Sequence, residues 1–142
     1  MPSNKDFEVI IVKNEFPELG RMLPERFNRG MDAMAEDGLN HAKLLMNDSP
    51  ASGRTYKRPG GKTHTASSPG NAPRPDTGAL INSLRWERRG RSEMDRVLIA
   101  SAEHGYYLEY GTEKMAARPF FRPTANHLRA DVRRFFVDVV KP

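Results

Sequence analysis

Residues 16–50, FPELGRMLPERFNRGMDAMAEDGLNHAKLLMNDSP, carry the pattern that decides the fold. Apolar side chains recur in this stretch at spacings close to those of a helix, which places them along one side of it. Pro24 fits either the first turn of one main helix or a kink between a short piece and a long one. Residues 47–50, Asn-Asp-Ser-Pro, end the helix. We therefore predict a long N-terminal helix whose apolar stripe consists of Leu19, Leu23, Phe27, Met31, Met34, Ala42 and Leu45.

Several shorter segments have the β-branched and aromatic composition of strands. FEVIIVK, residues 7–13, is short and apolar and fits a strand or an edge β-arm. Residues 84–90 and 96–103 are two further candidates joined by a polar turn, and Trp86 is expected to face the core. GYYLEYG, residues 105–111, is predicted as another strand of the same sheet. One side of that strand is expected to pack against the helices through Tyr106, Leu108 and Tyr110.

The remaining helical signals complete an α+β pattern. Asp76 or Thr77 can cap a short helical turn just before residue 84. Residues 122–140 are amphipathic and predict a C-terminal helix with Pro123 in its first turn. The apolar side of this helix consists of Ala125, Leu128, Val132, Phe135 and Val139. We expect one domain over residues 1–142, an antiparallel sheet with the long N-terminal helix and the C-terminal helix packed on one face.

Residues 49–75, SPASGRTYKRPGGKTHTASSPGNAPRP, have a different composition from the rest of the chain. Glycine and proline are frequent and aliphatic side chains nearly absent, so we expect an extended loop that cannot fill a core. Every formal charge between Asp48 and Asp76 is positive. Such a loop can neutralise phosphates without base specificity; the alternative is a solvated insertion with no partner. The basic side chains are Arg54, Lys57, Arg58, Lys62 and Arg74.

Composition narrows the class of protein. A chain of 142 residues fits one ordinary domain. Its net charge of +5 favours polyanionic neighbours, either nucleic acid or acidic protein surfaces. The absence of cysteine excludes disulfides and thiolate metal sites. No stretch reaches the ~20 apolar residues that span a bilayer, and the N-terminal apolar run is too short for a signal peptide. We therefore expect a protein made and used in solution, with no membrane partner.

Motifs of catalysis and cofactor binding do not stand out. The sequence has no nucleophile elbow, phosphate loop or dinucleotide fingerprint, and its four histidines form no recognisable metal motif. Glu103, Glu109 and Glu113 could in principle serve acid–base chemistry, but salt-bridging side chains near the sheet edge are the better interpretation. We expect no enzyme activity, no cofactor and no metal.

Two stretches carry a resemblance to a known family. PDTGALINSL, residues 75–84, follows the basic loop, and YLEYGT…ARPFFRP lies within residues 107–123. With the long helix before them, they form a succession from about Phe27 to Val140. This succession resembles the tail-completion or head–tail joining proteins of long-tailed bacteriophages, which lie in the neck between the capsid portal and the tail tube.

The resemblance implies a structural subunit of the virion, located in the neck or tail and in the host cytoplasm during assembly. Its copies would form a ring, expected to be a hexamer, that joins the DNA-filled head to the tail. Its neighbours would be a head-completion, stopper or adaptor ring and the tail-terminator or tail-tube proteins. Double-stranded DNA would pass through the channel, and the basic loop would line it or reach a neighbouring ring.

The same resemblance points to residues that determine the fold and form interfaces. Gly111 would end a strand, and Glu109 could pair with an arginine of the same or an adjacent subunit. Residues 7–13 could add to a neighbour's sheet, and Phe121 and Phe136 are expected to be exposed at a subunit face. The motif residues are Thr77, Gly78, Tyr107, Glu109, Tyr110, Gly111, Thr112, Arg118, Pro119 and Phe120.

Two other classes of function stay open. A small basic protein could bind nucleic acid through residues 49–75 as a monomer or dimer. A nuclease or hydrolase built around Glu103, Glu109 and Glu113 is the third possibility; metal-dependent cleavage abolished by Glu109→Gln would support it.

Overall fold

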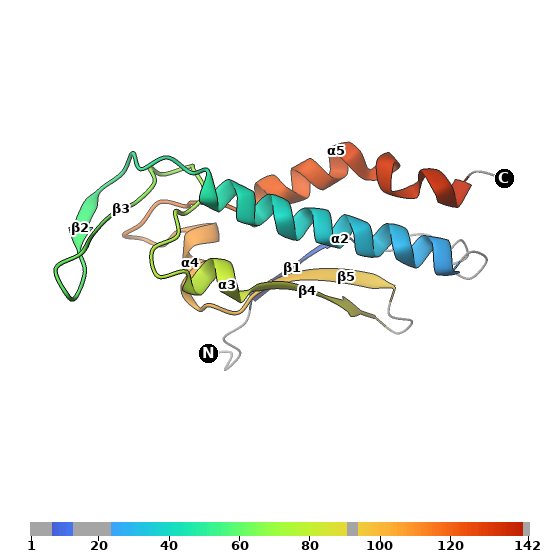
Figure 1. Ribbon diagram of the computed structural model, residues 1–142, viewed down its shortest axis with the longest axis horizontal. Helices are drawn as coiled ribbons and strands as arrows, with labels where there is room; N and C mark the ends of the chain where they lie inside the picture. Colours follow the sequence, from blue (N-terminus) through green and yellow to red (C-terminus); the bar gives the residue numbers. More distant parts are fainter. Residues whose placement is uncertain (1–6, 13–23, 91–93, 141–142) are drawn as a thin grey trace.

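The computed structural model describes residues 7–12, 24–90 and 94–140, and it has the expected α+β architecture (Figure 1). The long helix α2 and the C-terminal helix α5 lie side by side over a three-stranded antiparallel sheet. A separate two-stranded hairpin projects beyond the C-terminal end of α2. The elements are β1 (Phe7–Val12), α2 (Pro24–Asn47), β2 (Thr55–Lys57), β3 (Thr63–Thr65), α3 (Ala79–Ser83), β4 (Leu84–Arg89), β5 (Asp95–Ala100), α4 (His104–Tyr110) and α5 (Phe121–Val140).

The predicted long helix is confirmed from Pro24 to Asn47, with Pro24 at its first position. The side chains expected on its apolar stripe are buried from Phe27 to Ala42, and Leu45 packs against the core. Leu19 and Leu23 lie outside the described residues. Gly30 lets α5 approach closely, because a Cβ there would lie 2.7 Å from the carbonyl oxygen of Phe135.

The sheet has the strand order β1-β5-β4, so the predicted strands at 7–13, 84–90 and 96–103 are present with slightly different ends. β5 is the central strand: β4 pairs with it from Leu84↔Ala100 to Arg89↔Asp95, and β1 pairs along its other edge. Residues 96–100 are all buried, which explains their nearly continuous apolar composition. One edge of β1 is therefore paired with β5 of its own chain.

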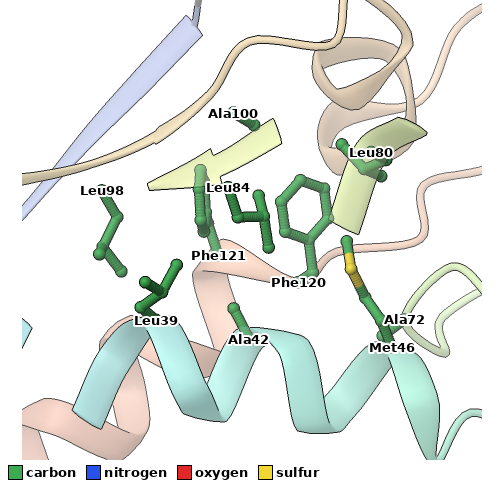
Figure 2. Packing of buried hydrophobic residues seen from close by; sticks show 10 residues of the cluster. All are labelled: Leu39, Ala42, Met46, Ala72, Leu80, Leu84, Leu98, Ala100, Phe120 and Phe121. Carbon is green, nitrogen blue, oxygen red and sulfur yellow. The ribbon is translucent and has the colours of Figure 1, made fainter. Parts of the chain in front are cut away.

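The core lies between α2, α5 and the sheet. Its larger cluster joins the C-terminal half of α2 to β4, β5 and the start of α5, with Phe120 and Phe121 both fully buried (Figure 2). A second cluster around Phe27, Met31 and Leu128 holds α2 against α5. The expectation that Phe121 is exposed was wrong, because its side chain fills the space between the start of α5 and β5; Phe136 is only half-buried.

One element has the wrong predicted type. Residues 104–110 form the helix α4, not a strand, and the Tyr106 and Tyr110 side chains are half exposed instead of packing against the helices. Their buried neighbours are Gly105 and Glu109, four residues apart on one side of a helix. Gly111 therefore ends a helix; its amide donates to the Tyr107 carbonyl oxygen.

Residues 49–75 contain more regular structure than the extended loop that we predicted, and part of the segment is buried. They contain the β2–β3 hairpin, and Ser67, Ala72 and Pro73 are buried. Ala72 belongs to the larger core cluster. The expectation that nothing in this segment fills the core was therefore wrong: its buried members are small side chains held by backbone contacts, which a count of aliphatic residues overlooks.

Candidate functional site

A cleft of about 760 Å³ lies where the base of the hairpin meets α3 and α4. It brings together segments that are far apart in sequence: the end of α2, residues 54–81 and residues 104–118. Both motifs of the sequence analysis contribute to it. The lining side chains that bear on its chemistry are Arg54, Tyr56, His64, Ser67, Arg74, Asp76, Thr77, Gly78, His104, Tyr107, Thr112 and Arg118.

Glu109 belongs to α4, which forms one wall of this cleft, and it joins α4 to the start of α5. Its side chain is only 2% exposed. One carboxylate oxygen, Oε2, accepts hydrogen bonds from the amides of Phe120 and Phe121 at 2.8 and 2.9 Å, and Oε1 accepts one from the Arg122 amide at 2.8 Å. They are the amides of the residue just before α5 and of its first two residues, which have no partner within the helix. Glu109 is therefore a helix cap for α5, and the expected pairing with an arginine side chain was wrong.

The segment between α4 and α5 connects the cleft to the hairpin base. Gly111 has φ 76, a left-handed conformation, and a Cβ there would lie 2.9 Å from the Ala117 amide nitrogen. The Arg118 amide donates to the Leu108 carbonyl oxygen at 2.6 Å, and its Nε donates to the Ser67 carbonyl oxygen at 3.1 Å. Arg118 thus holds the hairpin segment against α4, as a fold-determining residue would.

The two residues just before α3, Thr77 and Gly78, shape the side of the cleft that α3 borders. Gly78 has φ 82, which allows the chain to turn into α3. The Thr77 hydroxyl accepts a hydrogen bond from the Ala79 amide at 3.2 Å, so Thr77 of the two expected capping residues makes this contact. The cleft is therefore bordered by a short, locally stabilised turn.

The five basic residues of the 49–75 segment fall into two groups. Arg58 forms an ion pair with Asp76 at 3.0 Å, and Arg74 donates to the Thr65 carbonyl oxygen at 3.0 Å, so both stabilise the hairpin. Arg54, Lys57 and Lys62 are exposed. Of these three, Arg54 lines the cleft, whereas the two lysines flank the hairpin turn.

Three tyrosines of α4 form an aromatic patch beside the cleft. Tyr106, Tyr107 and Tyr110 are each about half exposed, with 45% for Tyr107. The ring centroids of Tyr106 and Tyr110 are 5.0 Å apart, and those of Tyr106 and Tyr107 are 5.9 Å apart. The motif residue Phe120 lies instead in the core and is fully buried, whereas Pro119 is partly buried.

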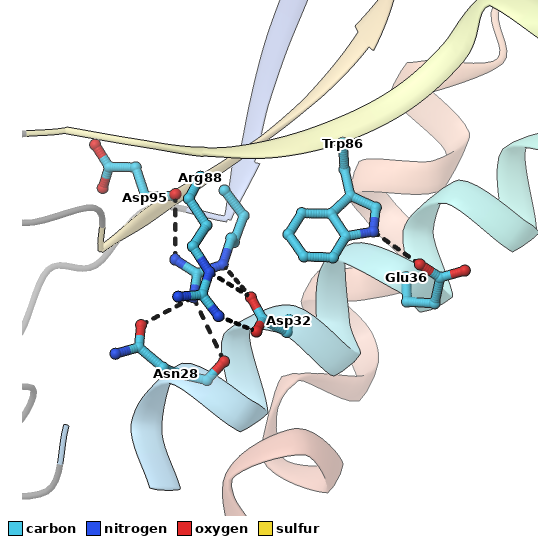
Figure 3. A network of polar contacts seen from close by, with 7 residues as sticks. Asn28, Asp32, Glu36, Trp86, Arg88 and Asp95 are labelled. Carbon is cyan, nitrogen blue, oxygen red and sulfur yellow. Dashed lines mark hydrogen bonds and ion pairs between the residues drawn. The ribbon is translucent and has the colours of Figure 1, made fainter. Parts of the chain in front are cut away.

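A polar network lies away from the cleft, where α2 meets β4 and β5 (Figure 3). Arg96 is 1% exposed, and its Nε donates to Asp32 Oδ1 at 2.6 Å; Arg88 donates to Asp32 Oδ2 at 2.6 Å. Partial burial by itself raises the pKa of Asp32. The hydrogen bonds and positive charges of both arginines outweigh that effect and hold the pKa below its usual value of 3.8. This network is structural, because its groups satisfy one another.

Two histidines meet between α2 and α5. The rings of His41 and His127 stack with centroids 4.0 Å apart, and His127 Nε2 lies 2.9 Å from Asp37 Oδ2. Burial, followed by the charge of His127, lowers the pKa of His41 below 6.5, and Asp37 opposes this shift. His41 is thus a helix-packing histidine.

The described part of the chain has no group of three or more His, Asp or Glu side chains that could hold a metal ion. Glu103 and Glu113 are exposed, whereas both oxygens of Glu109 are occupied by backbone amides. These three carboxylates are therefore not gathered as a catalytic pair would be.

Of the helices that the structure describes, none is long and apolar enough to cross a membrane.

Comparison with family models, curated proteins and solved structures found no match to this chain. The structure brings Arg54, Arg74, Tyr107 and Arg118 to one cleft, together with the α3 turn. Ser67, His64 and His104 were missed, because nothing in their local sequence marks them as sharing a site.

Proposed function

We propose that this protein is a non-enzymatic structural subunit of a bacteriophage neck, where copies of it form a ring that joins the DNA-filled head to the tail. The proposal begins with the resemblance carried by residues 75–84 and 107–123. Both stretches contribute to the contacts that join the hairpin, α3 and α4. The ring, its copy number and its neighbours are part of the proposal.

The observation that carries the proposal is the projecting basic hairpin. β2 and β3 extend away from the body formed by the helices and the larger sheet (Figure 1). Lys57 and Lys62 are exposed on either side of its turn, and Gly60 and Gly61 have φ 89 and 81 within it. A rigid body with a basic projection fits a ring whose projections face duplex DNA and contact its phosphates without reading sequence.

The α4 tyrosines offer a surface for contacts between subunits. Tyrosine is enriched at protein interfaces because it buries a large apolar ring and still offers a hydroxyl. A ring requires a heterologous contact, in which one face of a subunit meets a different face of the next. We assign the patch of Tyr106, Tyr107 and Tyr110 to one of these faces.

The experiment is electron microscopy of particles from cells that lack the protein, complemented by wild type or by variants. Filled heads and finished but separate tails in its absence would support the joining role. The Lys57→Ser/Lys62→Ser variant should restore joining but impair DNA retention or delivery. The matched control, Arg129→Ser/Arg133→Ser, removes two exposed charges from α5 and should behave as wild type. Normal, infectious virions without the protein would refute the proposal.

A second candidate is a small basic nucleic-acid-binding protein that uses the same hairpin without forming a ring. The exposed lysines favour it equally, so the two candidates differ in assembly. A binder should shift free duplex DNA as a monomer or dimer, and loss of both lysines should reduce its log–log salt slope by up to about 1.8. Separate heads and tails in cells that lack the protein, together with no binding of free duplex DNA by the purified protein, would favour the neck subunit.

A further inference from the structure

We propose that the cleft between the hairpin base, α3 and α4 binds an extended peptide segment of a partner protein, one that carries a carboxylate side chain beside apolar ones. This inference does not depend on a ring or on DNA contact. A volume of about 760 Å³ is within the usual range of ligand sites in proteins. The cleft is therefore large enough for a short stretch of chain, and its lining indicates which kind.

The charge of the lining favours an anion. Arg54, Arg74 and Arg118 contribute three guanidinium groups, whereas the acidic lining residue, Asp76, is already paired with Arg58 at 3.0 Å and lies 3.4 Å from His64. Single hydrogen bonds to backbone carbonyls orient Arg74 and Arg118. A guanidinium has five N–H donors, so each keeps donors for a carboxylate, which arginine binds in bidentate fashion.

The remaining walls favour a peptide over a nucleic acid. Apolar side chains make up much of the cleft, including those of Met46, Leu80, Ile81, Leu108 and Met115. Apolar surface contributes to binding when it covers apolar groups, and the outer face of a nucleic-acid backbone presents phosphates instead. Alternating apolar and acidic side chains of an extended peptide would use both parts of the lining.

One buried group in the wall of the cleft lacks a hydrogen-bond partner among the described residues. The Ser67 side chain is fully buried at the cleft wall, and its hydroxyl has no hydrogen-bond partner among the described residues. A buried hydroxyl without a partner costs free energy, since it has lost its bonds to water. This hydroxyl has no exposed surface, so a ligand in the cleft does not reach it and it says nothing about the kind of ligand. The charge and the apolar lining of the cleft agree on one class of ligand.

The test uses the full chain and a fluorescein-labelled heptapeptide whose sequence does not occur in this chain, Ser-Glu-Val-Pro-Glu-Leu-Ala. This probe has two carboxylates among apolar side chains, and its proline keeps the preceding residue extended. Fluorescence anisotropy should show saturable binding. The same peptide with both Glu replaced by Gln should bind at least about tenfold more weakly, because it cannot form the charge-assisted bidentate hydrogen bonds that arginine makes with a carboxylate.

Two exposed lining residues provide the protein variants. Arg54→Gln and Tyr107→Ser should each weaken binding about fivefold or more, since both border the cleft; having two keeps the test decisive if one variant misfolds. Arg133→Gln, an equal charge change on α5, should leave affinity unchanged. No saturable binding up to about 1 mM, or equal affinity for the Gln peptide, would overturn the proposal. Displacement of the peptide by a dT oligonucleotide at equal concentration would overturn it in favour of nucleic acid.

Discussion

Replacing Glu109 by glutamine should remove the cap that joins α4 to α5. The carboxylate accepts three backbone amides at 2.8–2.9 Å from a position that is 2% exposed. Glutamine retains one carbonyl oxygen, which can still serve two of these amides, but its NH₂ group then faces the third donor. A lost hydrogen bond to a charged acceptor costs about 1.5–3 kcal/mol, and the lost charge at a helix N-terminus adds about 0.3–1 kcal/mol. We expect Glu109→Gln to lower the free energy of unfolding by about 2–4 kcal/mol.

Urea unfolding measures this loss directly. Trp86, the single tryptophan, reports on the sheet by fluorescence, and circular dichroism at 222 nm reports on the helices. For a chain of this length the melting temperature should fall by about 6–16 °C, with little change in the urea m-value because the same surface is exposed on unfolding. The control is Glu113→Gln, an exposed neighbour whose change should stay within about 0.5 kcal/mol. If Glu109→Gln unfolds within about 0.5 kcal/mol of wild type, the capping argument is refuted.

Three further predictions concern the interface of α2 with α5 and the sheet. Gly30→Ala should lower the free energy of unfolding by about 1–3 kcal/mol, measured by thermal unfolding. Alanine has the better helix propensity, but its Cβ would lie 2.7 Å from the Phe135 carbonyl oxygen. The control is Asn40→Ala at an exposed position, which should be nearly neutral. Asp32→Asn should cost about 3–5 kcal/mol in urea unfolding at neutral pH, because it leaves Arg96 charged and 1% exposed beside a neutral amide. Since the folded pKa of Asp32 is lowered, its contribution is present above about pH 4 and is lost as the pH falls, so the variant should show a flatter acid limb. The pKa of His41 is also lowered in the folded chain, so the unfolded chain binds the proton more readily and the protein becomes less stable as the pH falls. The urea midpoint should therefore fall from about pH 7.5 to pH 5.5. If the urea midpoint of His41→Gln fell by the same amount between these pH values, His41 would not be the cause.

Much of the fold could be predicted from periodicity. The apolar stripe from Phe27 to Ala42 is buried as expected, and residues 96–100 form the central strand, because burial on a fixed face leaves a direct mark on the sequence. The prediction failed at residues 105–111. Tyrosines at 106 and 110 with Leu108 between them suggested alternation, but the side chain that the core requires there is a carboxylate, Glu109, whose partners are amides more than ten residues away.

The candidate site was only partly predictable, and the reason is physical. Residues 49–75 are ordered by backbone bonds, such as those from the Gly53 amide to the Ala66 carbonyl oxygen at 2.8 Å and from the Gly70 amide to the Ala117 carbonyl oxygen at 3.0 Å. A Cβ at Gly53 would lie 2.3 Å from the Ser67 carbonyl oxygen, so glycine here permits close packing as well as a turn. Backbone pairing of this kind leaves almost no compositional signal.

The positive charge of the segment was visible in the sequence, but the different places of its basic residues were not. Arg58 and Arg74 stabilise the hairpin, Lys57 and Lys62 flank its turn, and Arg54 borders the cleft. That division means that a phosphate-binding role and a peptide-binding role would draw on different members of one basic segment, so substitutions at the two lysines and at Arg54 should separate them.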